Sequence, residues 1–220
     1  MTNWLKKILV IIPVFMLTVF FLHEHYAAEY QHASSKRLSF FAITILLLYG
    51  WMLMETKHRK QELFFEIGLQ SSFYVYVFMV LTLTGYFILF REISAHDWWH
   101  KMMVRVETKY RVNFELLKVF KIYKITHKQV LGNLALLLPL GIYLPLLYKK
   151  MSNFFVVSFL CMLVSIGIEL LQLVTSFRST DIDDVFLNTI GAGAGFIIYS
   201  IAKNINKPIE NLSQVTPTLS

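Results

Sequence analysis

Six long stretches of the chain are almost free of charged side chains. They contain no Asp, Lys, Arg or His and a single Glu, and they cover residues 8–22, 38–54, 73–90, 130–148, 153–175 and 185–202. A helix needs roughly 20 apolar residues to cross a bilayer. Strands of a membrane barrel are only about ten residues long and alternate in polarity, whereas these stretches do not alternate. The pattern excludes a soluble domain and a barrel, and predicts an all-α, polytopic membrane helix bundle with about six transmembrane helices.

The positions of the basic residues predict how the chain is threaded. The net charge of +7 comes from 21 Lys and Arg against 14 Asp and Glu, and in a membrane protein such an excess reports orientation rather than nucleic-acid binding. With both termini inside, the inner segments hold nine basic residues and the outer ones twelve, nine of which lie in the third loop. The tight loops alone favour cytoplasmic termini by nine to three. We therefore predict a multi-pass cell-membrane protein with cytoplasmic termini.

The amino terminus also fits a second interpretation. Lys6 and Lys7 before the first apolar run are typical of a secretory signal peptide. Residues 23–35 offer no clean small-x-small cleavage site, which favours a retained helix.

The third loop, residues 91–129, is the largest polar segment. Its charged residues Glu115, Lys118, Lys121 and Lys124 recur every three positions between apolar ones. This pattern predicts an interfacial amphipathic helix with its lysines toward water or anionic lipid. Two functions remain open for it, a solvated basic face that only anchors the loop, and a funnel that attracts phosphate.

Polar residues gather where the last two apolar runs meet. Glu169 is the only Asp, Glu, Lys, Arg or His within the six runs, and an ionisable residue inside a membrane is a functional candidate by default. It shares one helical stripe with Ser158, Ser165, Gln172 and Ser176.

The loop that follows carries Arg178, Asp181, Asp183 and Asp184. Thr180 with Asp183 resembles a capping box that starts the last helix near Asp181.

The last helix carries a stripe of its own, formed by Asp184, Asn188, Gly191 and Gly195. The spacing of Gly191 and Gly195 allows close helix approach, either to the fourth or fifth helix of the same chain or to a second copy.

These helix ends lie at one membrane surface, which predicts a shared polar pocket. Its candidate residues are Glu169, Gln172, Arg178, Asp181, Asp184, Asn188 and Asn133. The alternative is a network that only locks the helices together. Carboxylate and amide oxygens suit Mg²⁺ or Ca²⁺, so a divalent cation is possible, although no cofactor is firmly predicted. His23, His25 and His32 form a weaker metal candidate.

Three sequence blocks resemble the VanZ-like family of bacterial membrane proteins. They are Asn133-Leu-Ala-Leu-Leu-Leu-Pro-Leu-Gly141, Glu169-Leu-Leu-Gln172, and Arg178 to Gly191. The family usually has Asn-Leu-x-Pro-Phe before the fourth helix, whereas this chain has Asn113-Phe-Glu-Leu-Leu117 and keeps only the asparagine. The resemblance implies a cell-envelope protein, since the family's founder is associated with resistance to the glycopeptide antibiotic teicoplanin.

The resemblance covers residues 111–202, and with the rest of the sequence it predicts three regions. Residues 1–90 would be three added transmembrane helices, 91–202 the VanZ-like membrane core and 203–220 a disordered tail.

Two functional hypotheses follow. One is a non-enzymatic module that binds an envelope lipid, wall precursor or lipoglycopeptide through the pocket at the outer surface and contributes to glycopeptide tolerance. The other is a membrane-embedded, metal-dependent enzyme acting on a lipid-linked phosphate or sugar. In the enzyme, Asp181 or Asp184 would hold the cation and Arg178 would clamp phosphate. A small transporter is a weaker third interpretation. Membrane lipids are expected partners and nucleic acid is not.

Overall fold

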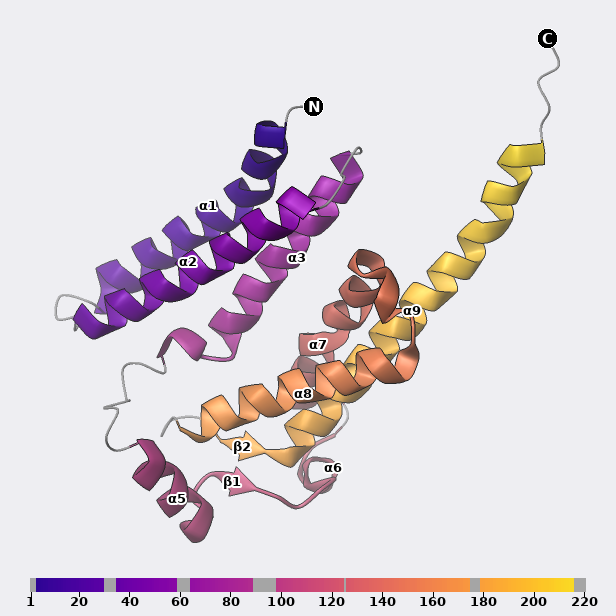
Figure 1. Cartoon of the computed structure of the whole chain (residues 1–220). Coiled ribbons are helices and arrows are strands. Elements are labelled where there is room, and N and C mark those ends of the chain that lie inside the picture. The colour runs from indigo at the N-terminus through magenta and orange to yellow at the C-terminus, as the bar shows by residue number, and fades with distance from the viewer. Residues whose placement is uncertain are drawn as a thin grey trace. The chain divides into compact units, whose positions relative to one another are not determined.

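The computed structural model describes residues 3–29, 35–58, 64–88, 98–124, 126–174 and 179–215. These residues are nearly all helical, which confirms the all-α prediction (Figure 1). The only strands in this part of the chain are two residues long. The chain divides after Lys101 into two units, which are described separately.

Three helices build the first unit. α1 (Asn3–Glu29) packs against α2 (Ser35–His58) and α3 (Phe64–Leu83), and a short 3-10 helix, η1 (Tyr86–Ile88), follows α3. The end of α3 was not predicted, because the apolar run continues to residue 90. Gly85 adopts a left-handed φ of 76°, a conformation typical of the residue after a helix end, so α3 stops at Leu83.

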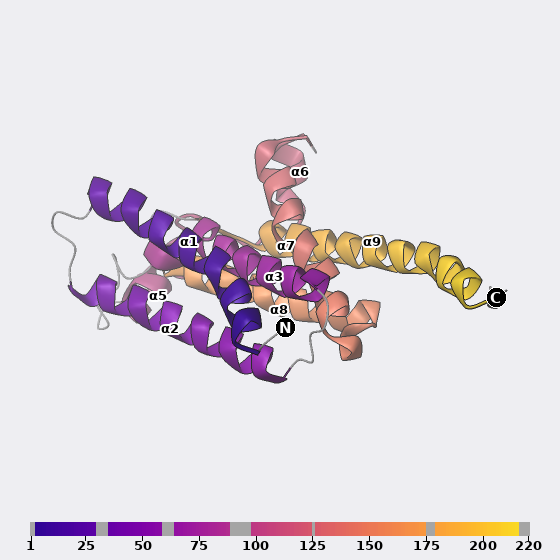
Figure 2. The same cartoon turned by 90° about the horizontal axis from the view of Figure 1, so that it is seen from above.

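The second unit holds the family-like segment. Its elements in chain order are α5 (Trp98–Thr108), β1 (Val112–Asn113), α6 (Lys118–Ile122), α7 (Lys128–Leu147), η2 (Lys149–Met151), α8 (Phe154–Leu173), β2 (Thr180–Asp181) and α9 (Ile182–Val215). α9 packs along both α7 and α8, and Figure 2 shows α9 running on beyond them. α9 is helical as far as Val215, within the region from residue 203 that the sequence predicted as a tail.

A glycine seam explains the close packing of α7 and α9. A Cβ atom built on Gly191 would lie 2.0 Å from the carbonyl oxygen of Leu134, and one on Gly195 would lie 2.1 Å from that of Leu138. On α7, a Cβ on Gly141 would lie 2.0 Å from the carbonyl oxygen of Ala192. Only glycine permits backbones to approach this closely. The small-residue pattern therefore serves contact with α7, the fourth helix of the same chain.

Within the part of the chain that the structure describes, four helices are long and apolar enough to cross a membrane. They are Glu66–Leu83, Lys128–Leu147, Phe154–Leu173 and Ile182–Ile205. The first two apolar runs lie in α1 and α2, which are helical but are not among these four. Four candidate spans thus stand against the six that the sequence predicted.

The third loop differs from its prediction. The sequence predicted one amphipathic helix that carries the regularly spaced charges, but the helix found there, α6, is only five residues long. Leu117 before it has a left-handed φ of 66°, which prevents a regular helix from extending further toward the amino terminus. β1 pairs in parallel with β2, with Val112 opposite Thr180 and Asn113 opposite Asp181. The loop is therefore attached to the start of α9.

Candidate functional site

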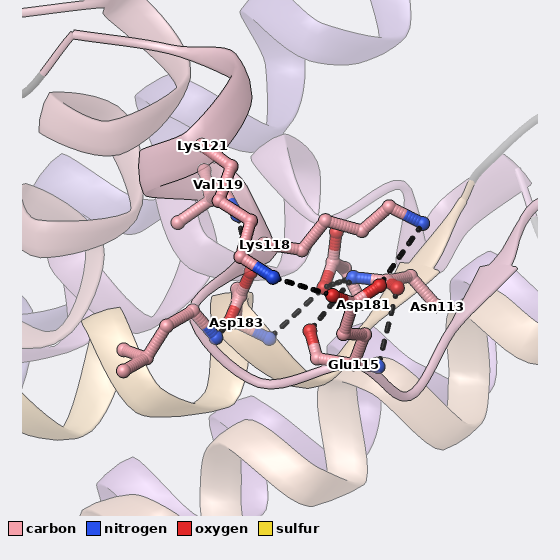
Figure 3. A network of polar contacts seen from close by, with 8 residues as sticks. Asn113, Glu115, Lys118, Val119, Lys121, Asp181 and Asp183 are labelled. Carbon is pink, nitrogen blue, oxygen red and sulfur yellow. Dashed lines mark hydrogen bonds and ion pairs between the residues drawn. The ribbon is translucent and has the colours of Figure 1, made fainter.

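Asp181 lies directly before α9 and joins three segments of the chain. Its Oδ1 accepts a hydrogen bond from the backbone amide of Asp183 at 2.9 Å and one from Asn113 Nδ2 at 2.8 Å (Figure 3). The first bond is an N-cap, which satisfies an amide that has no intrahelical partner. The predicted helix start is confirmed, but Asp181 is the cap. Thr180, the predicted capping residue, instead approaches the carbonyl oxygen of Glu169 with its hydroxyl, at 3.4 Å.

Asp183 is fully buried and binds the loop with both carboxylate oxygens. Oδ1 accepts from the amide of Leu117, and Oδ2 accepts from the amide of Val119 at 2.6 Å. These amides open α6 and have no partner within that short helix. A carboxylate from α9 therefore caps α6 from outside.

The next acid, Asp184, connects α9 to α7. Its Oδ1 accepts a hydrogen bond from Asn133 Nδ2, so this predicted pair does meet. One turn further, Asn188 Nδ2 donates to Ser165 Oγ of α8 at 2.8 Å. Its Oδ1 is buried, with no hydrogen-bond partner among the described residues. The stripe on α9 thus faces both neighbouring helices.

Glu169 and Gln172 lie near the end of α8. Glu169 is 5% exposed, and its Oε2 accepts from the amide of Asp181 at 2.8 Å. The backbone carbonyl of Gln172 accepts from Arg105 Nη1 at 3.0 Å. Of the predicted pocket residues, Arg178 lies outside the described residues. The same holds for His32 of the weaker histidine group.

Arg105 on α5 is a buried cation that caps α8. Its Nη1 also donates to the carbonyl of Leu173 at 2.6 Å, and its Nη2 to that of Arg111 at 3.3 Å. The carbonyls at a helix end have no intrahelical partner and carry partial negative charge, so a guanidinium with several donors suits this position. Arg105 ties α5, α8 and the loop together.

We call residues 109–124 the strap. Its inner side is held by Val119, which packs with Val130 of α7 and Leu187 of α9 in a buried cluster. Its backbone is strained, because Lys109, Arg111 and Leu117 all have positive φ. Such conformations cost of order 1 to 3 kcal/mol each and persist only where surrounding contacts hold them. The contacts of Arg105 and Asp183 supply that support.

One acidic side chain of the strap faces its lysines. Glu115 Oε1 lies 2.8 Å from Lys121 Nζ, and Glu115 Oε2 lies 3.8 Å from Lys118 Nζ. The hydrogen bond and charge of Lys121 hold the pKa of Glu115 below its usual range, and Glu115 raises the pKa of Lys121. All three side chains are solvent-accessible, so these pairs stabilise the fold little.

The three carboxylates that start α9 point to different partners. Asp181 faces Asn113, Asp183 faces two strap amides, and Asp184 faces Asn133. Among the residues that the structure describes, no group of three or more His, Cys, Asp or Glu could hold a metal ion. Each acid is engaged by donors of the chain itself, so the arrangement acts as a scaffold for the strap.

The pocket prediction missed Asp183, Asn113 and Arg105. A signal existed for two of them. Asp183 lies in the dense acidic loop, and Asn113 is the residue that this chain keeps from the family's element. Its bond to Asp181 gives that asparagine a structural role. Arg105 lacked a signal, because its partners are backbone carbonyls, and the two on α8 lie more than 60 positions away.

The apolar helices and the acid-centred network together define an all-helical membrane protein whose last three helices carry a polar scaffold at one end. The chain belongs to the VanZ/LLP1 family, whose model matches residues 4–203. This confirms the resemblance, and the matched segment includes the first three helices, beyond residues 111–202 where the motifs lie. No curated protein and no solved structure matches the chain.

Proposed function

We propose that the protein is a non-enzymatic envelope module that binds an envelope lipid, a wall precursor or a lipoglycopeptide at the outer membrane surface. In this role it would contribute to glycopeptide tolerance. The observation that carries the proposal is the engagement of the acids at the start of α9 by the protein's own donors. Through these bonds the acids hold the strap and the start of α9 in place as a binding surface.

The exposed charge of the surrounding surface supports the same function. In the strap, Lys109, Arg111, Lys121 and Lys124 are exposed, against a single acid, Glu115. Phosphate and carboxylate groups of precursors and lipoglycopeptides are attracted to such a surface. The pocket of Glu169, Gln172, Arg178, Asp181, Asp184, Asn188 and Asn133 would then form its base.

The proposal includes a topology. The helices α1 and α2 would cross the membrane with the four candidate spans, giving six transmembrane helices with cytoplasmic termini. The strap would lie along the interface on the outer side, at the same surface as the start of α7 and the end of α8. This arrangement places the polar end where wall precursors and glycopeptides are met.

Binding to purified protein in nanodiscs tests the proposal. The probes are teicoplanin and a polyprenyl-pyrophosphate-linked wall precursor, each titrated against the wild type. The Asp183→Asn and Glu169→Gln variants should bind at least about tenfold more weakly, since each of these groups holds the strap or the start of α9. The matched control is Lys150→Gln, an exposed residue of η2 at the other end of α7. Wild-type protein that bound neither probe would refute the recognition of wall precursors and lipoglycopeptides.

A turnover assay separates the enzyme hypothesis. The wall precursor and a polyprenyl phosphate are incubated with wild-type protein, with and without a chelator, and product is measured by mass spectrometry. We expect unchanged substrate. Product formation that the chelator abolishes, and that Asp184→Asn also abolishes, would establish a metal-dependent enzyme in place of the binding module.

A further inference from the structure

The outer side of the strap is apolar although it faces away from the bundle. Phe114 is 59% exposed, Leu116 51% and Ile122 59%, and Tyr110 and Phe120 are exposed as well. The inner side is already satisfied by Val112 and Val119, both buried. An exposed apolar patch of this kind marks an interaction site in a stable protein.

The exposed side chain of Leu117 lowers the stability of the strap, because the backbone at this position is strained. Leu117 is 44% exposed and has a φ of 66°, a conformation in which glycine has no steric penalty. Local stability alone therefore favours a small residue at this position. The large apolar side chain of Leu117 therefore indicates a contact with a partner other than this protein chain.

The location of the strap identifies the class of partner. It adjoins the amino-terminal ends of α7 and α9 and, through Arg105, the carboxyl-terminal end of α8. All three of these helices are candidate membrane spans, so their shared end is a membrane surface. A segment with aromatic and aliphatic groups beside lysines is typical of the bilayer interface.

The charge of the strap selects among lipids. Glu115 is its single acid, against five basic residues, which are Lys109, Arg111, Lys118, Lys121 and Lys124. Lys128, one turn later at the start of α7, adds a sixth positive charge nearby. Lysine side chains extend from an apolar surface toward the headgroups, and they attract anionic lipid when they lie near the membrane surface. A zwitterionic headgroup offers no net charge for this attraction.

We infer that the strap inserts its apolar side chains into the leaflet and recruits anionic phospholipid through its lysines. This inference rests on the envelope-lipid part of the proposed function and names the lipid as the bulk anionic phospholipid around the protein, so it holds whether or not a precursor or antibiotic binds. Glu115 regulates the site, since it competes with lipid phosphate for Lys118 and Lys121 (Figure 3).

Lipid-specific fluorescence quenching tests this inference in the full chain. A bimane probe is attached at position 122 of an Ile122→Cys, Cys161→Ser protein reconstituted in vesicles. Quenching by brominated phosphatidylglycerol is compared with quenching by brominated phosphatidylcholine. We expect quenching by both lipids, with an anionic preference of at least about threefold.

Three charge variants give different expected results. The double variant Lys121→Gln, Lys124→Gln should remove the anionic preference. Glu115→Gln should raise the preference above the wild-type value by a factor of up to about five, the effect of one added charge near the surface. An increase cannot result from misfolding. The control, Lys149→Gln with Lys150→Gln, alters exposed charges at the other end of α7 and should change nothing.

Three results would overturn the inference. The first is a probe at position 122 that neither lipid quenches, because the strap then stays in water. The second is quenching without anionic preference in the wild type. The third is probe shielding that grows with protein density in the vesicles, which would show that a second copy covers the face.

Discussion

The difference between Asp181 and Asp183 gives the sharpest prediction of the structure. Asp181 accepts both of its bonds on Oδ1, and an asparagine retains one such oxygen. Asp183 uses both oxygens for two backbone amides. An Asp183→Asn side chain therefore directs an NH₂ group toward one of these N–H donors. Two substitutions of equal size and equal charge change should consequently have unequal effects.

The expected magnitudes follow from the hydrogen bonds. Asp183→Asn loses a charge-assisted bond and leaves a buried amide unpaired, a combined cost of about 2–4 kcal/mol. Asp181→Asn loses only the attraction of a charge to the start of a helix, about 0.3–1 kcal/mol. For a chain of this size, each kcal/mol lowers Tm by roughly 2–4 °C.

Two measurements check this pair. Thermal unfolding in detergent should show a Tm drop for Asp183→Asn that is several times larger than that for Asp181→Asn. Hydrogen exchange should accelerate in strap peptides that contain Leu117 and Val119, and only in the Asp183 variant. Equal Tm values together with equal strap exchange would refute the assignment of Asp183 as the anchor of α6.

Three further substitutions and one matched control test the other contacts by thermal unfolding. Gly191→Ala should cost about 1–3 kcal/mol of stability by overpacking against Leu134. The control Gly167→Ala, with nothing within 4 Å of its added Cβ, should be neutral or stabilising. Equal Tm values for the two variants would contradict the close packing of α7 and α9. Arg105→Lys should lower the stability by about 1.5–3 kcal/mol, because one ammonium cannot reach the separated carbonyls. A Tm equal to that of the wild type would show that the guanidinium of Arg105 is not needed for stability. Asn133→Leu should lose about 1–3 kcal/mol because it removes the donor to the Asp184 carboxylate, and an unchanged Tm would exclude that bond as a link between α7 and α9.

The helices and part of the network could be predicted from the sequence because their signals are local. Apolar runs of suitable length predicted the four candidate spans that the structure bears out, and the spacing of Gly191 and Gly195 predicted a close helix contact. Which helix they contact could not be derived, because a small-residue pattern identifies a packing surface and not its partner. The motifs also predicted the family, which the match over residues 4–203 confirms.

The strap could not be predicted because its structure depends on distant partners. The bond from Val119 to Asp183 joins positions 64 apart in the sequence, and that from Asn113 to Asp181 joins positions 68 apart. The regular spacing of Glu115, Lys118 and Lys121 suggested a helix, yet these residues form short ion pairs beside a five-residue helix. Tertiary contacts outweigh local periodicity where a segment is short and strongly anchored.

The side of the membrane on which the polar end lies decides the proposed function most directly. Single cysteines are introduced by Ser179→Cys, next to β2, and by Ser152→Cys, after η2, in a Cys161→Ser background; both serines are exposed. Intact cells are then treated with a membrane-impermeant maleimide. Labelling at position 179 in intact cells, and at position 152 only after permeabilisation, would place the strap and its acidic scaffold outside, as proposed. The reverse pattern would place them in the cytoplasm and contradict recognition of wall precursors or glycopeptides at the outer surface.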